Sequence, residues 1–369
     1  MLPQAPRRTF LQRAAALAAA TLLAPLSRAA GAAAGDTVID VRSKGARGDG
    51  KGDDTAAFQA AIDALPARGG TVRVPAGNYM IDAARSIALR SNMHLDMAAD
   101  AQLTALPNAR KRYHVLRVWR AHDVRITGGR IVGERDQHQG SEGEWGYGIN
   151  ISASRNVTVD GTHISGCWGD GMWIGALGKR AAAELSMDVT VRNVVSTNNR
   201  RQGLSIGPCT RVRILDSTFS DTHGTKPEAG IDLEPQKQGP TSDVLIEGCT
   251  ITGNKGCGVE VHKNVSGLVI RRCTIRDNAG YGVLAVDMND LWVDGNTVTG
   301  NGLTGVTVAG RTRDAKITGN TLQSNGTRYV HRMLKALVSA GSAKGNRKRD
   351  ADLRIDANTA NVRSSDNTF

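Results

Sequence analysis

The sequence predicts an all-β protein built as a solenoid, in which short strands stack as successive coils. A glycine followed by an apolar, a variable and a second apolar residue recurs seven times. Successive copies lie 23 to 32 residues apart, a period typical of solenoid coils that bury their apolar sides only by stacking. The 43 glycines and the aromatic content of 4% suit stacked aliphatic residues with tight corners.

The seven repeats set the inward and outward positions of the predicted strands. They begin at Gly148, Gly171, Gly203, Gly230, Gly258, Gly282 and Gly305. The first and third residues after each glycine are nearly all Ile, Leu, Val or Met, so we expect them inside. The second and fourth residues then point outward, where chemistry can take place.

Residues 1–34 have the composition of an export signal. Arg7-Arg8 stands before Phe10-Leu11, an apolar run follows over residues 14–23, and small residues fill 29–34. The pattern resembles a twin-arginine translocation signal, with general secretion as the alternative. Because the apolar run is too short for a permanent membrane span, we expect a protein exported to a bacterial periplasm or beyond.

The net charge of +12 is unevenly distributed. Residues 1–35 contain four arginines and no acid, and residues 326–349 contain seven basic residues and no acid. The remainder is nearly neutral, so the charge predicts no nucleic-acid partner. The basic segment is interpreted as a solvated loop, with attraction to an anionic polymer as the alternative.

The opening segment, residues 36–80, predicts a cap for the solenoid. A strand over 38–41 is followed by an amphipathic helix with Phe58, Ala61, Ile62 and Leu65 on one face, and by a strand over 71–74. Asp53 or Asp54 is placed to cap the helix. A helix covering the open end would shield apolar surface and unpaired strand edges.

The same segment resembles a known family. Three of its stretches carry the resemblance: Lys44-Gly45-Ala46-Arg47-Gly48-Asp49-Gly50, Asp53 to Ile62 and Gly69 to Tyr79. They are similar to the opening of the pectate lyase superfamily, which includes polygalacturonases, polysaccharide lyases and phage tailspikes. The resemblance implies a right-handed parallel β-helix over 36–325 and a carbohydrate substrate, but not one reaction.

Three further patterns are structural predictions. Residues 326–369 should form a basic amphipathic helix from Val330 to Val338, a loop and a final strand. Asn199, Asn254, Asn278 and Asn301, four residues before the repeat glycines, should form an amide ladder at a turn that favours left-handed backbone. Cys249 and Cys273 should stack on consecutive coils, as a small-residue column or alternatively as a disulfide.

Four outward residues on two adjacent coils form the candidate catalytic cluster. The repeat register places Asp232, Glu234, Glu260 and His262 in a square with sides of roughly 5 Å between coils and roughly 7 Å along a strand. Carboxylates this close should have at least one raised pKa, or should hold a cation. A purely structural cluster is the alternative. Asp170, at the bend two coils earlier, is a fifth catalytic candidate.

Four other residues are candidate substrate contacts. Trp173 is an outward aromatic that would stack on a sugar ring, or would pack under the insert over 176–185. Arg201 and Lys263 are cations near the predicted cluster. His138, in the loop over 134–145, belongs to a segment long enough to overhang it, although a surface histidine is the plainer interpretation.

Glycoside hydrolysis is the first hypothesis for the reaction. Paired carboxylates supply the acid and the base that it requires, here from Asp232, Glu234 and Glu260, with His262 tuning them and Asp170 assisting. This reaction needs no cofactor and no metal site. The Asn-Thr-Asp, Asp-Asp, Gly-His-Gly and Arg-Ile-Lys signatures of polygalacturonases are absent, so homogalacturonan is a doubtful substrate.

Two other classes remain open. A polysaccharide lyase or uronate C5-epimerase would abstract the C5 proton, using Lys263, Arg201 or His262 and Ca²⁺ held by the three carboxylates. It ranks second because only His262 is basic within the square. A non-catalytic tailspike-like module, in which the acids bind sugar hydroxyls, is the third class.

Overall fold

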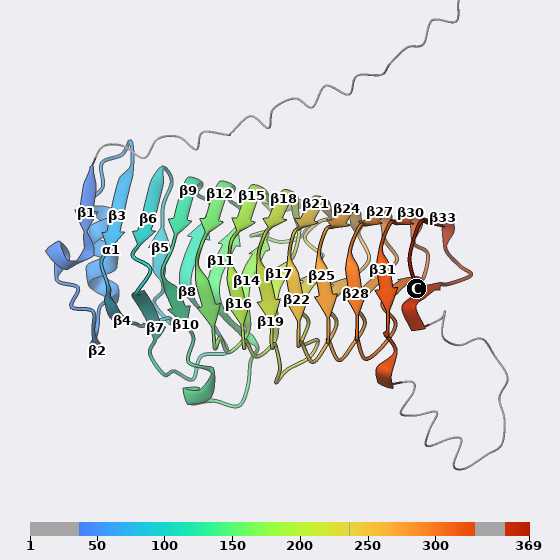
Figure 1. Ribbon diagram of the computed structural model, residues 1–369. Helices are drawn as coiled ribbons and strands as arrows, with labels where there is room; N and C mark the ends of the chain where they lie inside the picture. Colours follow the sequence, from blue (N-terminus) through green and yellow to red (C-terminus); the bar gives the residue numbers. More distant parts are fainter. Residues whose placement is uncertain (1–36, 236, 329–350) are drawn as a thin grey trace, which may run out of the picture. The chain divides into compact units, whose positions relative to one another are not determined.

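The structure is a computed structural model that describes residues 37–235, 237–328 and 351–369. Its strands form three parallel sheets of 12, 11 and 10 strands, and successive strands along the chain pass from one sheet to the next. Each coil therefore contributes one strand to each sheet, and the strand labels follow one another along the solenoid axis (Figure 1). The predicted right-handed parallel β-helix is confirmed.

The first sheet, sheet A, is the longest of the three. It contains β1 (Val38–Asp40), β3 (Gly70–Val74), β6 (Met93–Met97), β9 (His122–Thr127), β12 (Arg155–Asp160), β15 (Ser186–Arg192), β18 (Cys209–Leu215), β21 (Thr241–Glu247), β24 (Val265–Arg271), β27 (Asn289–Asp294), β30 (Arg313–Thr318) and β33 (Ala360–Ser365).

Sheet B follows at the next corner of each coil. It contains β2 (Asp49–Asp53), β4 (Gly77–Ile81), β7 (Ala101–Ala105), β10 (Arg130–Val132), β13 (His163–Ser165), β16 (Val195–Thr197), β19 (Thr218–Ser220), β22 (Thr250–Thr252), β25 (Thr274–Arg276), β28 (Thr297–Thr299) and β31 (Thr321–Gln323).

Sheet C carries the seven repeats and the candidate site. It contains β5 (Ile87–Leu89), β8 (Arg112–Trp119), β11 (Trp145–Ser152), β14 (Asp170–Gly175), β17 (Gln202–Ile206), β20 (Ile231–Leu233), β23 (Val259–Val261), β26 (Val283–Val286), β29 (Val306–Ala309) and β32 (Leu353–Ile355). Three short 3₁₀ helices interrupt the coils, η1 (Val41–Lys44), η2 (Arg135–Gln137) and η3 (Arg180–Ala182).

Stacked aliphatic side chains fill the interior of the coils. Leu204, Ile231 and Val259 occupy the same strand position on consecutive coils, and all three are completely buried. The predicted inward positions of sheet C are therefore correct. Each coil buries its apolar residues against the coils before and after it, as expected of a solenoid.

The repeat glycines are required by close approach between coils. A Cβ atom at Gly258 would lie 2.7 Å from the carbonyl oxygen of Gly282 and 2.6 Å from Cγ2 of Ile275. Side chains cannot be accommodated at such distances without moving the backbone of the next coil. The glycine column thus keeps adjacent coils at strand spacing.

The predicted asparagine ladder is present over Asn254, Asn278 and Asn301, but it does not include Asn199, whose Nδ2 donates to Oγ of Ser196. Asn254 Nδ2 donates to Asn278 Oδ1 at 2.8 Å, and Asn278 Nδ2 donates to Asn301 Oδ1 at 3.0 Å. The expected left-handed backbone falls on the preceding residue instead, as at Asp277, which has a φ of 56°. The asparagine side chains consequently satisfy buried backbone groups from an ordinary conformation.

The helix α1 (Thr55–Asp63) lies at the end of the solenoid that begins with β1 (Figure 1). Phe58 and Ile62 are fully buried on its apolar face. The carboxylate of Asp53 accepts a hydrogen bond from the backbone N–H of Thr55 at 2.9 Å, so Asp53 satisfies a free N–H group in the first turn of the helix. The carboxylate of Asp54 instead accepts backbone N–H groups of the preceding loop.

All five cysteines are free thiols. Cys249 and Cys273 are both buried, and their sulfurs face backbone carbonyls in the column that also contains Ser217 and Asn296. The small-residue column is therefore the correct interpretation, and the alternative disulfide is absent.

Two predicted segments lie outside the described residues, the export signal over 1–34 and the amphipathic helix over 330–338. The final coil is present, because β32 and β33 extend sheets C and A beyond β29 and β30. Within the described ranges, no helix has both the length and the apolar character needed to cross a membrane.

Candidate functional site

The candidate site lies on the outer face of sheet C, over β20 and β23. The strand register pairs Asp232 with Glu260, so their side chains are direct neighbours on consecutive coils. Glu234 and His262 follow where the two strands end, and Pro235, which has no N–H to continue the ladder, comes directly after Glu234. The predicted square of four residues is therefore close to the arrangement found.

Three members of the square form one compact group. The Nε2 atom of His262 lies 3.2 Å from Oδ1 of Asp232 and 3.6 Å from Oε1 of Glu260. The imidazole side chain is 45% exposed, whereas that of Asp232 is completely buried. An accessible imidazole thus rests on a buried carboxylate.

The fourth member, Glu234, turns away from this group toward Arg201. Two parallel hydrogen bonds of 3.1 Å join the guanidinium to the two carboxylate oxygens of Glu234. The same guanidinium lies 3.3 Å from both carboxylate oxygens of Asp170. A basic residue therefore does stand among these acids, contrary to the prediction that His262 is the only one.

Gln202 connects the group around His262 with the group around Arg201, and it was not identified from the sequence. Its Oε1 accepts from Arg201 at 2.8 Å, and its Nε2 donates to Oδ2 of Asp232. It occupies the position before a repeat glycine, as Asp170 does on the coil before. Comparing that column across the repeats would have identified Gln202 and also Tyr147, which lies before Gly148.

Burial dominates the electrostatics of the two aspartates. It raises the pKa of Asp170 to about 7, although Arg201 opposes the shift. Burial also raises the pKa of Asp232 to about 6, against the effect of His262. The influence is mutual, because the Asp232 carboxylate raises the pKa of His262 above its ordinary value of 6.5. The pKa values of the two buried aspartates thus lie close to neutral.

Arg201 remains a cation in this environment. Its burial lowers the pKa of the guanidinium, but the carboxylates of Asp170 and Glu234 outweigh that effect, and the pKa is raised. Tyr147, which is nearly buried, has a raised pKa because of burial and the neighbouring Asp170, so it keeps its phenolic proton.

The cluster agrees only in part with the prediction. At least one carboxyl group has a raised pKa, as expected, and Asp232 is a member that shows it. Asp232 points outward from the coil as predicted, but both it and Asp170 are completely buried. Glu260 and Glu234 retain 18% and 16% of their side-chain exposure. Asp232 and Asp170 are therefore inaccessible, whereas His262, Glu260 and Glu234 keep part of their side chains at the surface.

Trp173 lies flat beside the cluster. A Cβ atom at Gly175 or at Gly207 would lie within 2.7 Å of its indole ring, so the ring covers these two glycines. Its centroid is 6.1 Å from that of Tyr147, and the residue is partly exposed. The indole thus continues the outer surface of sheet C next to Ser205 and Asp232.

The predicted surface position of His138 is wrong. Its side chain is only 1% exposed and stacks on Trp168 with ring centroids 3.8 Å apart. Arg200 lies over the same indole, with its guanidinium carbon 3.6 Å from the ring centroid. His138 therefore anchors the loop over 134–145 and does not face the cluster. From that loop, Glu144 lies 3.7 Å from Nε of Arg201.

Lys263 is exposed directly after His262. The predicted calcium ligands do not converge, since Glu234 is bound to Arg201 and Asp232 to Gln202. Within the part of the chain that the structure describes, no three His, Cys, Asp or Glu side chains are arranged to hold a metal ion. The residues present therefore do not fit Ca²⁺.

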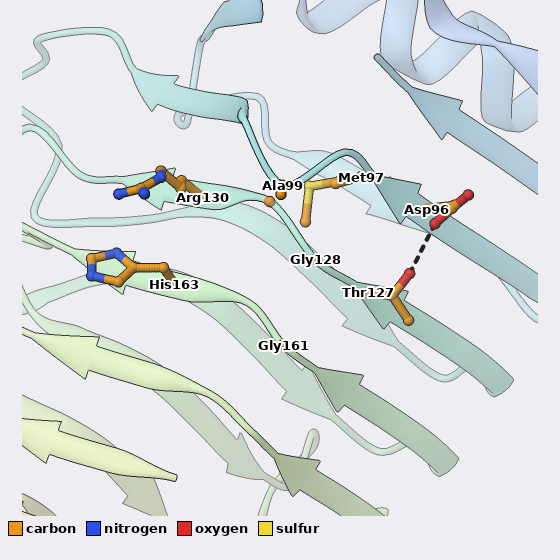
Figure 2. Close-up of a pocket in the computed structure, with 9 residues that line it drawn as sticks. Asp96, Met97, Ala99, Thr127, Gly128, Arg130, Gly161 and His163 are labelled. Carbon is orange, nitrogen blue, oxygen red and sulfur yellow. Dashed lines mark hydrogen bonds between the residues drawn. The ribbon is translucent and has the colours of Figure 1, made fainter. Parts of the chain in front are cut away.

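Two surface hollows lie away from this cluster. One is bordered by sheets A and B, with Arg130 and His163 side by side and Asp96 bonded to Thr127 (Figure 2). The other, on sheet A, includes Trp292 and Lys316. The acid cluster is thus a surface feature of sheet C, distinct from both hollows.

Comparison with known proteins identifies relatives for most of the chain. The model of the family described as "Right handed beta helix region" matches residues 111–241 and 237–322. A second model, "Rhamnogalacturonase A/epimerase, pectate lyase-like", matches residues 38–116, the segment whose motifs resemble that superfamily.

Two Bacillus subtilis proteins without a characterised function are among the relatives. YorA is 30% identical over 63% of this chain and 44% of its own length, and YclG is 28% identical over 82% and 58%. The chain thus spans about half the length of these curated relatives. Mannuronan C5-epimerase AlgE5 of Azotobacter vinelandii is 27% identical over 73% of this chain and 25% of its own length.

Solved structures agree on the fold. The A-module of the Azotobacter vinelandii mannuronan C5-epimerase AlgE6 has a TM-score of 0.63 and 18% identity, over 89% of this chain and 98% of the module. The Dettilon tailspike protein has a TM-score of 0.61 and 15% identity, over 89% of this chain and 62% of its own. The chain therefore belongs to the right-handed parallel β-helix proteins of the pectate lyase-like superfamily.

Proposed function

We propose that this protein is an exported enzyme that acts on a uronate-containing polysaccharide by removing the proton at C5 of a uronic acid. The observation that carries the proposal is the accessible imidazole of His262 on the buried carboxylate of Asp232, with 3.2 Å between Nε2 and Oδ1. The similarity to a mannuronan C5-epimerase supports the same substrate class.

His262 is the base in this proposal. With its proton on Nε2, facing Asp232 and Glu260, the ring carries a lone pair on Nδ1. Nδ1 takes the C5 proton, and the electron pair of the C–H bond moves toward the C6 carboxylate. Asp232 and Glu260 stabilise the imidazolium that forms, because both carboxylates lie within 4 Å of Nε2.

Two outcomes are chemically possible from that carbanion. Breaking the bond between C4 and its glycosidic oxygen forms a C4–C5 double bond and cleaves the chain, as in a lyase, and the leaving oxygen takes a proton from the His262 imidazolium or from water. Delivery of a proton from water to the opposite face of C5 inverts the centre without cleavage, as in an epimerase, and the His262 imidazolium then returns its proton to solvent. Both routes begin with the same proton abstraction.

Charge complementarity sets one condition on the substrate. Five carboxyl groups surround Arg201 and His262, and they would repel a polyuronate if all were ionised: Glu144, Asp170, Asp232, Glu234 and Glu260. The raised pKa of Asp170, about 7, keeps part of this charge neutralised by a proton, whereas Asp232, with a pKa of about 6, is mostly ionised at the pH at which His262 is neutral. The exposed Lys263 is available for the substrate carboxylate.

Glycoside hydrolysis is the second candidate, favoured by the two partly exposed glutamates, Glu234 and Glu260. The geometry supports it less well because Asp232 is inaccessible and Glu234 is bound by Arg201 through two hydrogen bonds. Glu260 is then the accessible carboxylate of the cluster that Arg201 does not bind, and its neighbour is the imidazole of His262 at 3.6 Å.

One experiment separates the reactions. The purified protein is incubated in ²H₂O with polymannuronate, polyguluronate or polygalacturonate, with and without EDTA. A lyase yields new reducing ends with ultraviolet absorbance, an epimerase yields deuterium at C5 without cleavage, and a hydrolase yields reducing ends alone. New reducing ends without ultraviolet absorbance would contradict C5 proton abstraction and support glycoside hydrolysis. Binding of a polymer without any reaction would contradict both reactions and support a non-catalytic, tailspike-like module.

A further inference from the structure

Sheet A presents an aromatic platform remote from the acid cluster on sheet C. Trp292 of β27 is 39% exposed, and its indole Nε1 donates to Oγ1 of Thr318 at 2.9 Å. That hydroxyl donates in turn to Oδ1 of Asp294 at 2.6 Å. The two bonds hold an exposed ring in one orientation, so its face is organised before any ligand arrives.

The column that contains Trp292 is apolar on one side and basic on the other. Leu245, Val269, Trp292 and Lys316 are direct register neighbours on four consecutive coils. Lys316 is exposed, and Arg363 follows it on the last coil. The strip therefore combines a stacking surface with cations along the solenoid axis.

A hollow of about 510 Å³ adjoins this column. Its lining includes Gly267, Ser266, Asp243 and Asp290. Asp243 is held by Arg213, with 3.0 Å between its carboxylate and the guanidinium. Exposed hydroxyl and carboxylate groups beside an indole are the partners that sugar hydroxyls require.

We infer that this surface, named the Trp292 strip after Leu245, Val269, Trp292 and Lys316, is a second, non-catalytic binding site for an acidic polysaccharide. One pyranose ring stacks on Trp292, and the carboxylate of a neighbouring uronate binds Lys316. Coils repeat every ~4.8 Å, close to the length that one pyranose adds to an extended chain, so a chain along the axis keeps this register. The identity of the polymer rests on the proposed function, but the site does not.

The test measures how many oligosaccharide sites the protein has, in a variant that does not convert the ligand during the titration. His262→Gln is titrated calorimetrically with a mannuronate hexamer and with cellohexaose, its neutral counterpart. We expect two hexamer sites. Adding Trp292→Ala should weaken one of them roughly tenfold, whereas Trp292→Phe should retain it. Val38→Ala, which truncates another exposed apolar residue of sheet A, is the matched control and should change nothing.

Three results would contradict this inference. If the affinity of both hexamer sites is unchanged in Trp292→Ala, the Trp292 strip is not the second site. Equal binding of cellohexaose, unaffected by Lys316→Ala, would overturn the assignment to an acidic chain. Concentration-dependent dimers that Trp292→Ala abolishes in sedimentation would assign the strip to a second copy of this protein. Binding is measured in a variant without catalysis. A lack of C5 proton exchange in the wild-type protein would therefore contradict the proposed function but not the second binding site.

Discussion

The Nε2 atom of His262 lies 3.2 Å from Oδ1 of Asp232, and the aspartate is completely buried beneath the imidazole. In the proposed reaction the carboxylate would therefore act on a substrate only through the histidine. Asp232 is then a positioning residue, and His262 is the group that exchanges the proton.

Replacing His262 by glutamine should lower the rate of C5 proton exchange about 10²- to 10⁴-fold, the usual contribution of a positioned general base. KM should change little, because the amide keeps the size and polarity of the ring. Solvent deuterium incorporation, followed by NMR, measures the rate. Lys263→Gln is the matched control: it should raise KM for a polyuronate and leave the rate at saturation nearly unchanged.

The pH profile should show the influence of Asp232. Only neutral His262 accepts a proton, so the rate should rise with pH to a plateau, with a midpoint above 6.5 because Asp232 raises the pKa of the imidazole. Asp232→Asn removes the negative charge and should shift the midpoint to lower pH. A midpoint that stays in place would show that Asp232 does not act through His262.

Asp170 should make the folded state less stable as pH rises. Its folded pKa of about 7 is above the ordinary 3.8, so the folded state binds this proton more tightly than the unfolded state does. The resulting stability is present below about pH 4 and is lost as pH rises through 7, up to about 4 kcal/mol. Denaturant titrations from pH 4 to 8 should show a smaller decline for Asp170→Asn than for the wild type.

The repeat period was sufficient to predict the solenoid and to place Asp232 beside Glu260. Inward residues such as Ile231 and Val259 can be identified from the alternation of apolar and variable residues along a strand, because the interior accepts only apolar side chains. Strand register then follows from the glycines, whose Cβ positions are blocked by the next coil. These are local rules, and they held for the seven repeats of sheet C, from β11 to β29.

What the repeat could not predict is which way long side chains turn. Glu234 is in its predicted place, but its carboxylate joins Arg201, a residue at the bend of the preceding coil. The side chain of His138 packs on Trp168 because the loop over 134–145 folds inward. Such contacts depend on loop conformation and on competition between partners, which strand alternation does not encode.

Removing Arg201 should be costly for stability. Arg201→Met removes the cation that faces the carboxyl groups of Glu234 and Asp170, and breaking a buried ion pair in this way costs about 3–5 kcal/mol. Urea unfolding at pH 7 measures the loss. Arg211→Met, which breaks an exposed pair with Asp188, should cost less than about 1 kcal/mol. Similar losses for the two variants would mean that the Arg201 network does not stabilise the fold.

The amide ladder should carry stability independent of the catalytic cluster. Asn278→Ala removes the acceptor of both the backbone N–H and the Nδ2 group of Asn254, and both of these donors are buried. Each unsatisfied donor costs about 1–3 kcal/mol, so we expect a loss of about 2–5 kcal/mol in urea unfolding. Asn289→Ala, at an exposed position of β27, is the matched control and should cost less than about 0.5 kcal/mol. Because the ladder joins neighbouring coils, hydrogen exchange in Asn278→Ala should accelerate first around β22 and β25, and uniform acceleration along the solenoid would contradict this local role.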